Sequence, residues 1–279
     1  MSSLSDLKHL RDVLSRQESI MPVLFVGHGS PMNGIEDNEF SNSWKALGRT
    51  LVRPKAVVVI SAHWLTAGTR VTAMDKPQTI HDFGGFPKAL FEVQYPAPGS
   101  PTLARDISSL VRTTDVQQDH DWGLDHGAWT IVRHMFPDAN IPVLQLSIDY
   151  TKSSSYHYQL AKELGELRKR GVLLLASGNM VHNLRAINWN LPSNGYDWAI
   201  ESNETFKKNI LEGNHKALIE YERLGSAVRM AIPTPEHYLP LIYAIGLQES
   251  ADLVTVFNDK TLMGSISMTS LLIGSTEKA

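Results

Sequence analysis

The stretch AVVVISAHW, residues 56–64, decides the fold, because five apolar residues run directly into a polar segment that ends in His63 and Trp64. Three other runs share this form, each rich in Val, Leu or Ile and followed at once by Gly, Asp or Ser: PVLFV (22–26), PVLQLSI (142–148) and VLLLA (172–176). Continuous apolar runs of this length are typical of strands buried on both faces in a parallel sheet. We expect these four segments to form the centre of one sheet.

Helical patterns lie between and after these runs. Apolar residues recur at helical spacing over residues 38–51, 101–111 and 153–170, and the last third is expected to be largely helical over 197–224 and 238–246 before closing strands at 253–257 and 265–272. Strands that alternate with helices predict an α/β fold. We expect a single domain over residues 22–274 with a mostly parallel central sheet flanked by helices. Residues 1–21 are expected to be an N-terminal extension with a short helix.

The composition excludes several classes of protein. The chain has 279 residues, a net charge of −3 and no cysteine, so disulfides, thiolate nucleophiles and cysteine-bound zinc are excluded. No block of Lys and Arg points to a nucleic-acid partner. No segment approaches the ~20 apolar residues of a membrane span, and the first twenty residues lack the apolar centre of a signal peptide. We therefore expect a cytoplasmic enzyme.

Three histidines follow predicted strands: His28 in VGHGSP, His63 in ISAHW and His182 in LLLASGNMVHN. Ligands of parallel α/β sheets bind at the carboxyl ends of the strands, so these side chains can converge on one site there. Taken alone, His28 is interpreted as a turn residue, and His63 as either a core residue or a metal ligand. Together they favour a shared metal, because neutral imidazole is the commonest metal ligand.

Two further histidines are candidates for the same site. His237 in PTPEHYLP is either a site residue or an exposed helix start, and His126 in GLDHGAW is either a site residue or a loop histidine paired with Asp125. His81 lies in TIHDFGGFP, a Gly- and Phe-rich loop of the kind that covers a pocket. The remaining five histidines are expected at the surface: His9, His120, His134, His157 and His215.

Seven motifs follow one another along the chain: GHGSPMN (27–33), SAHW (61–64), TIHDFGGFP (79–87), YPAPGSP (95–101), DHGAW (125–129), SGNMVHN (177–183) and PTPEHYLPL (233–241). In this order they resemble the 4,5-DOPA extradiol dioxygenase family, part of the superfamily of the protocatechuate 4,5-dioxygenase β-subunit (class III extradiol ring-cleaving dioxygenases). The resemblance covers residues 22–274 and implies a catalytic domain that opens the ring of a catechol such as L-DOPA by 4,5-cleavage, with O₂ and a histidine-bound non-haem metal.

The resemblance also implies roles for single residues. His28, His63 and His237 match metal ligands, and His182 matches either a fourth ligand or the acid–base histidine. His126 matches a pocket histidine, which makes it the partner of His182 in proton transfer. A set of histidines suits Zn²⁺ as well as Fe²⁺, so we expect Zn²⁺ in the resting or purified protein and Fe²⁺ for dioxygenase activity.

Two other functions use the same histidines. The first is a zinc-dependent hydrolase, in which the metal activates a water molecule. The second is a metal-binding protein without catalysis. For a substrate that carries a carboxylate, the sequence leaves three candidate partners open: Arg185, Lys88 and His81.

Overall fold

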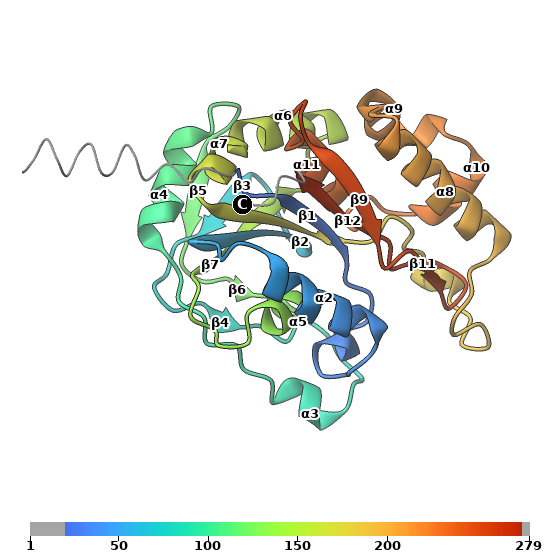
Figure 1. Cartoon of the computed structure of the whole chain (residues 1–279), viewed down its shortest axis with the longest axis horizontal. Coiled ribbons are helices and arrows are strands. Elements are labelled where there is room, and N and C mark those ends of the chain that lie inside the picture. The colour runs from blue at the N-terminus through green and yellow to red at the C-terminus, as the bar shows by residue number, and fades with distance from the viewer. Residues whose placement is uncertain (1–19, 275–279) are drawn as a thin grey trace, which may run out of the picture.

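The four apolar runs form neighbouring parallel strands in the computed structural model, which describes residues 20–274. They lie in an eight-stranded sheet of order β5-β3-β7-β2-β8-β1-β12-β9 (Figure 1). This confirms the α/β fold with a mostly parallel centre. The four central strands are β7 (Val143–Asp149), β2 (Ala56–Thr66), β8 (Val172–Gly178) and β1 (Val23–Gly27).

The outer strands complete the sheet on both sides. β3 (Thr69–Thr72) runs antiparallel to β7 and carries β5 (Val116–Asp119) in parallel at the edge. At the other side, β12 (Ser270–Gly274) runs antiparallel to both β1 and β9 (Leu253–Phe257). β3 and β5 have no counterpart in the sequence prediction, because they are four residues long and partly polar.

The predicted closing strand over residues 265–272 is only partly right. The chain first forms the short β11 (Ile266–Ser267), which belongs to a separate two-stranded pair, and then enters the eight-stranded sheet as β12. The break coincides with a hydrogen bond from the Met268 backbone to the Lys260 carbonyl at 2.8 Å. β11 pairs with β10 (Thr261–Leu262), and a second small pair joins β4 (Gln78–Thr79) to β6 (Gly123–Leu124).

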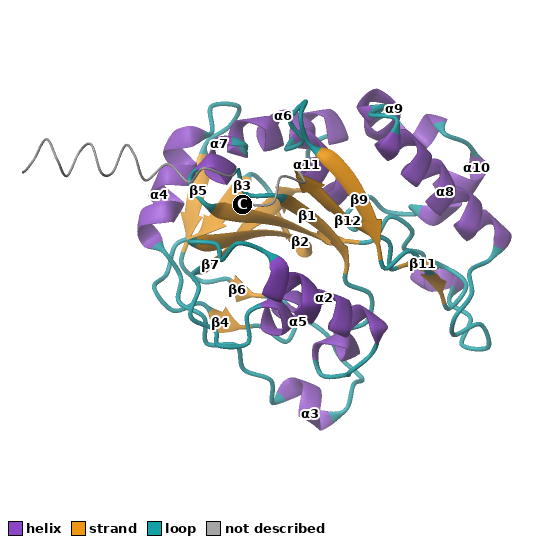
Figure 2. Cartoon of the chain, viewed as in Figure 1, coloured by secondary structure: helices purple, strands orange, loops and turns teal. Residues whose placement is uncertain are grey.

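Side chains of the central strands alternate between two hydrophobic cores. Val58 and Leu174 point into one core, whereas Val57 and Leu173 point into the other. Because both faces are covered by helices, the strands have no polar face, which explains their continuous apolar sequence (Figure 2). The first core is covered by α4 (Pro101–Leu110), α6 (Ser154–Leu164), α7 (Glu166–Lys169) and α11 (Leu239–Gly246), the second by α2 (Glu39–Thr50) and α5 (His126–Met135).

The helices begin where the sequence predicts. Asn38 caps α2 with a reciprocal capping box, and Ser100 caps α4 immediately before its first residue, Pro101. The predicted helix over 153–170 is interrupted at Gly165, which separates α6 from α7. The remaining helical segments are α3 (Lys88–Phe91), α8 (Asp197–Leu211), α9 (His215–Ile219), α10 (Ser226–Ala231), η1 (Pro31–Gly34), η2 (Leu184–Ala186) and η3 (Tyr221–Arg223).

Two predictions concern the chain outside this sheet. The predicted N-terminal helix falls on residues 1–19, which lie outside the described residues. Between residues 20 and 274, no helix has the length and hydropathy needed to cross a bilayer.

Candidate metal centre

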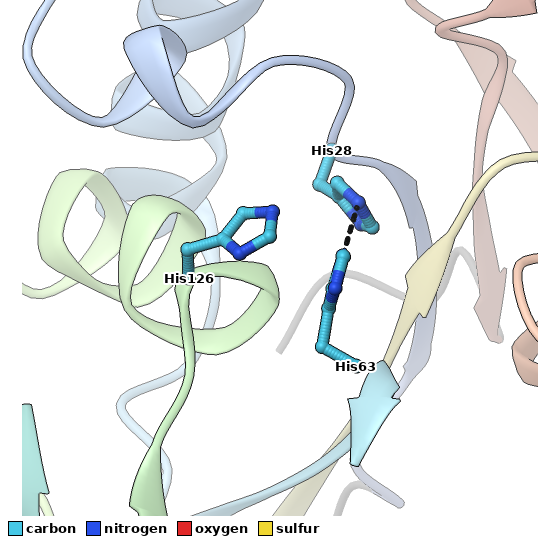
Figure 3. A group of neighbouring side chains, drawn as sticks. All are labelled: His28, His63 and His126. Atoms are coloured by element: carbon cyan, nitrogen blue, oxygen red, sulfur yellow. Dashed lines mark hydrogen bonds between the residues drawn. The ribbon is translucent and has the colours of Figure 1, made fainter. Parts of the chain in front are cut away.

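The predicted site residues meet at the carboxyl ends of β1 and β8 and at the distal half of β2. His28 directly follows β1, while His126 is the first residue of α5. Ring nitrogens of His28, His63 and His126 lie within 4.8 Å of one another (Figure 3). The convergence predicted from the positions of His28 and His63 is therefore present.

The position of His63 corrects one detail of the prediction. His63 does not follow β2 but lies inside it, since the strand continues to Thr66. The pairing of β2 with β8 stops at Ser61, and its register with β7 shifts between Ile60 and Leu65. This irregular part of the strand carries His63, and such bulges commonly redirect a side chain beside a site.

Hydrogen bonds fix the proton on the His28 ring. The Ser177 hydroxyl donates to the Gly127 carbonyl at 2.6 Å, so its oxygen is left to accept from the Nδ1–H of His28 at 3.0 Å. The Nε2 atom of His28 is then unprotonated and points at Nε2 of His63, 3.1 Å away (Figure 3). An unprotonated Nε2 is the form in which imidazole binds a metal.

Asp82 orients the other two rings. Its Oδ2 accepts from Nδ1 of His126 at 2.9 Å and lies 3.4 Å from Nδ1 of His63, while Oδ1 accepts from the His126 backbone at 2.9 Å. A carboxylate only accepts, so the proton of the neutral His126 ring lies on Nδ1 and its Nε2 is free. His126 therefore pairs with Asp82, not with Asp125 as the loop alternative had it.

His182 and His237 form the other side of the site. Their rings are stacked with centroids 3.5 Å apart, and the His237 ring lies 5.3 Å from His28 and 5.0 Å from His63. Glu236 lies beside them, with its carboxylate 3.4 Å from Nδ1 of His237. These three residues make a second group of potential ligands whose atoms lie within 4.8 Å of one another.

The electrostatics keep four of these rings neutral. Burial, followed by the neighbouring histidines, lowers the pKa of His28 and of His237 well below the ordinary value and that of His63 to about 3. Burial also lowers the pKa of His182 to about 4. Burial alone would raise the pKa of Asp82, but the hydrogen bonds and charge of His126 outweigh it and lower that pKa. All four rings are therefore available as ligands at neutral pH.

This donor set fits a transition metal. The Nε2 atoms of His28 and His63 lie 3.1 Å apart, a separation at which both can bind one cation. Two nitrogens bound at about 2.1 Å to one ion lie about 3.0 Å apart when the N–metal–N angle is a right angle, and about 3.4 Å apart when that angle is tetrahedral. The observed separation of 3.1 Å lies between these two values. Imidazole ligands suit Zn²⁺ and Fe²⁺, whereas Mg²⁺ and Ca²⁺ prefer oxygen.

The histidines form one wall of a pocket of about 290 Å³. None of the three candidates for a substrate carboxylate, Arg185, Lys88 and His81, is among the described residues that line it. His81 instead donates from Nε2 to the Val93 carbonyl at 3.0 Å, and Lys88 pairs with Glu92 at 3.2 Å. The opposite wall is apolar and consists of Pro31, Phe86, Leu184, Ile187, Trp189, Met263 and Ile266.

The prediction of five surface histidines is partly wrong. His120 is exposed and His215 is half-buried, but His134 and His157 are buried. Each buried ring makes one hydrogen bond: His134 with the Asn33 carbonyl at 2.7 Å and His157, through Nδ1, with the Tyr243 hydroxyl at 3.0 Å. A single histidine in a helical pattern does not reveal such a partner. His9 lies outside the described residues.

Sequence reasoning missed the residues that orient the site. Asp82 follows His81 in a motif that was noted, and Ser177 directly follows an apolar run that was predicted as a strand. Asp125 caps α5 from a fully buried position, where it accepts from Ser61 at 2.8 Å and from Gln145 at 2.7 Å. Burial raises its pKa to about 6. A polar residue beside a histidine motif is the only signal in the sequence that pointed to these partners.

Comparison with known proteins matches the chain to ring-opening dioxygenases. Residues 22–269 match the family described as the catalytic LigB subunit of aromatic ring-opening dioxygenase. The chain is 49% identical over 259 residues to an Escherichia coli (strain K12) protein named 4,5-DOPA dioxygenase extradiol, covering 91% of this chain and 95% of that one. A Beta vulgaris protein of the same name is 35% identical over 247 residues, covering 84% and 89% of the two chains.

A solved structure shares the architecture. The crystal structure of an uncharacterized protein from Escherichia coli K12 superposes with a TM-score of 0.80 at 43% sequence identity. The match covers 91% of this chain and 100% of the other.

Proposed function

Because the chain belongs to the family of the catalytic LigB subunit of aromatic ring-opening dioxygenases, and is an extradiol ring-cleaving dioxygenase, we propose that it uses O₂ to open a catechol ring beside the diol. The observation that carries this proposal is the pair of Nε2 atoms of His28 and His63, 3.1 Å apart in the wall of a pocket whose opposite wall is apolar. A metal held by these two residues would lie beside a space that fits an aromatic ring. L-DOPA, which gives the relatives their name, is the first catechol to test.

We assign His28, His63 and His237 as the metal ligands of this proposal. Their rings lie 5.0–5.3 Å apart, are held neutral by burial, and all line the pocket. When bound, a non-haem Fe²⁺ lowers the pKa of the catechol and exchanges electrons with O₂. Zn²⁺ binds such sites more tightly than Fe²⁺, so protein purified in air is expected to carry zinc and to gain activity with iron.

His126 and His182 are the candidates for proton transfer. Asp82 holds the Nδ1 proton of His126, which leaves Nε2 free to accept the proton of a phenol in the pocket. The carboxylate also stabilises the imidazolium that forms, as an acidic residue does for the histidine of a catalytic triad. His182 is stacked on His237, 3.5 Å away, and is close enough to serve as a fourth ligand or as the residue that returns the proton.

An oxygen-uptake experiment tests the proposal. Protein prepared without oxygen and loaded with Fe²⁺ should consume one O₂ per catechol, and the yellow ring-opened product should be 32 Da heavier than the substrate. The zinc form is the control and should stay inactive. Background oxygen uptake with several catechols, together with turnover of an ester or amide by the zinc form, would instead establish the hydrolase alternative. Tight metal binding with neither activity would establish a metal-binding protein.

A further inference from the structure

Asp125 is a fully buried carboxylate that the proposed function does not use. Between residues 20 and 274, no Lys or Arg forms an ion pair with it, so hydrogen bonds alone satisfy it. Oδ1 accepts from the Ser61 hydroxyl at 2.8 Å and from the Ala128 backbone at 3.1 Å, and Oδ2 accepts from the Gln145 amide at 2.7 Å. Capping α5 needs only the bond to Ala128, which an exposed aspartate makes without the cost of burying a charge. The other two bonds therefore point to a further role.

These two bonds connect the start of α5 to two strands of the sheet. Gln145 lies on β7 and also accepts from the Asp125 backbone at 2.7 Å, so a reciprocal pair of hydrogen bonds joins the two residues. Ser61 lies on β2, at the last position that pairs with β8, and its oxygen accepts from the His63 backbone at 3.2 Å. The Ser61 hydroxyl therefore holds the irregular segment of β2 that carries His63, and Asp125 holds that hydroxyl.

The first turn of α5 also packs directly against this segment of β2. A Cβ atom on Gly127 would lie 2.4 Å from the Ser61 hydroxyl oxygen and 3.0 Å from the His63 ring, so only glycine fits there. His126, in the same turn, has its ring centroid 3.9 Å from that of His63. The two rings come from different elements, α5 and β2 (Figure 3). The distance between them therefore depends on how α5 is held against β2.

Resting on the proposed function, we propose that Asp125 is a positioning residue that sets the distance between the proposed ligand His63 and the acid–base candidate His126. It does not line the pocket and therefore acts through its hydrogen-bonded neighbours on β2 and β7. Asp82 joins the rings of the two histidines, whereas Asp125 joins the segments of backbone that carry them. A misplacement of about 1 Å between reacting groups can lower a rate about 10²-fold, so this distance matters for catalysis.

Ser61→Ala separates this role from the capping of α5. The variant loses the bond between Asp125 and β2 but keeps the bonds of the carboxylate to Ala128 and Gln145. We expect kcat per bound Fe²⁺ to fall about tenfold or more with little change in KM, because the histidines and not the pocket walls are displaced. The matched control is Ser41→Ala, which removes a fully buried serine from the capping box of α2, outside the pocket lining. It should lower the free energy of unfolding and leave kcat per bound Fe²⁺ unchanged.

An exchange of the two hydrogen-bonding partners tests the carboxylate itself. In Asp125→Asn every orientation of the new amide and of the Gln145 amide leaves two donors facing each other. The double variant Asp125→Asn/Gln145→Glu restores the pattern, because the carboxylate introduced at position 145 accepts from both the side chain and the backbone of position 125. We expect the single variant to lose about tenfold or more in kcat per bound Fe²⁺, and the double variant to return to within about threefold of the unchanged protein. A double variant as impaired as Asp125→Asn would overturn the proposal.

The affinity for Zn²⁺ gives a readout that does not depend on turnover. In titration of the metal-free protein against a competing chelator, Ser61→Ala should bind Zn²⁺ about tenfold more weakly, because the backbone of His63 is no longer fixed. The double variant and Ser41→Ala should bind as the unchanged protein does. If no catechol is opened by the Fe²⁺ form, the proposed function fails, but these affinities still decide whether Asp125 positions His63. If ring opening occurs while Ser61→Ala keeps both its kcat and its affinity, the positioning proposal alone fails.

Discussion

At the scale of single residues, Asp82 connects two histidines to which we assign different roles, His63 in metal binding and His126 in proton transfer. One carboxylate oxygen is 2.9 Å from Nδ1 of His126 and 3.4 Å from Nδ1 of His63. In Asp82→Asn the amide keeps its shape but lacks the charge that stabilises an imidazolium. We expect kcat to fall about 10²–10⁴-fold, as in variants of a triad aspartate, with smaller changes in KM and metal content.

The measurement for Asp82→Asn is kcat, KM and metal content on one Fe²⁺-loaded preparation. Asp121→Asn, an exposed residue of the same type, is the control and should behave as the unchanged protein. Loss of the metal from Asp82→Asn in proportion to its loss of activity would show that the carboxylate holds the metal site through His63 and has no part in proton transfer.

The two neighbours of Asp82 should differ when each is replaced. His63→Ala removes one of the nitrogens that we propose as ligands and is expected to abolish both metal binding and activity. His126→Ala should keep nearly normal metal content while kcat falls about 10²–10⁴-fold, the typical contribution of a general acid–base group. Metal analysis by mass spectrometry beside oxygen uptake separates the two cases, with the exposed His120→Ala as the control. A His63→Ala protein that retains its metal would remove this residue from the ligand set.

The sequence predicts the histidines of this site better than it predicts their partners. A histidine at the end of a predicted strand, as at His28, has a defined place because the carboxyl ends of parallel strands share an edge of the sheet. Ser177 and Asp82 have no such pattern, since their roles depend on a partner about 149 and 44 residues away, respectively, in the chain. The pairing of His126 with Asp82 could therefore not be distinguished from pairing with the adjacent Asp125.

At the scale of elements, the end of β8 meets the loop that carries His237 without space for a side chain. A Cβ atom on Gly178 would lie 2.2 Å from the His237 carbonyl oxygen and 3.0 Å from Pro240. Because the contact involves backbone, the His237 segment must move away from β8 to relieve it. Gly178→Ala is expected to fold but to bind the metal at least about tenfold more weakly, because a ligand is displaced.

Titration of the metal-free protein with Zn²⁺ against a competing chelator measures this effect for Gly178→Ala. Gly84→Ala is the matched control: it lies in the loop of the TIHDFGGFP motif, and no atom lies within 4 Å of the added Cβ. Its affinity should equal that of the unchanged protein. An unchanged affinity in Gly178→Ala would show that the position of His237 is not set by the end of β8.

The central elements could be predicted because both faces of the sheet are buried. The four parallel strands and the helices that begin at capping residues follow from local sequence. The irregular end of β2 could not be predicted, because its register depends on β7 and β8 and not on the residues around His63. The apolar wall could not be predicted either, since residues 183–195 and the β10–β11 hairpin show no periodicity and meet only in the folded chain.

At the scale of the whole molecule, the fold buries neutral imidazoles in more than one place. His157, on α6, is fully buried against α11, outside the candidate metal site. Nδ1 of its ring shares a hydrogen bond of 3.0 Å with the Tyr243 hydroxyl. Burial lowers its pKa from the ordinary 6.5 to about 4. Between these two values the unfolded chain binds a proton that the folded chain does not, so stability falls as pH decreases through this range.

Unfolding of the metal-free protein by urea at pH 7 and at pH 5 measures this linkage. The lowered pKa of His157 should account for roughly 2 kcal/mol of the decrease in unfolding free energy over that interval. His157→Gln keeps a polar partner for Tyr243 but has no proton to gain, so its decrease should be smaller by that amount, whatever its stability at pH 7. His120→Gln, which replaces an exposed histidine, should follow the unchanged protein. Parallel decreases in His157→Gln and the unchanged protein would mean that the folded state accommodates the charged ring at this position.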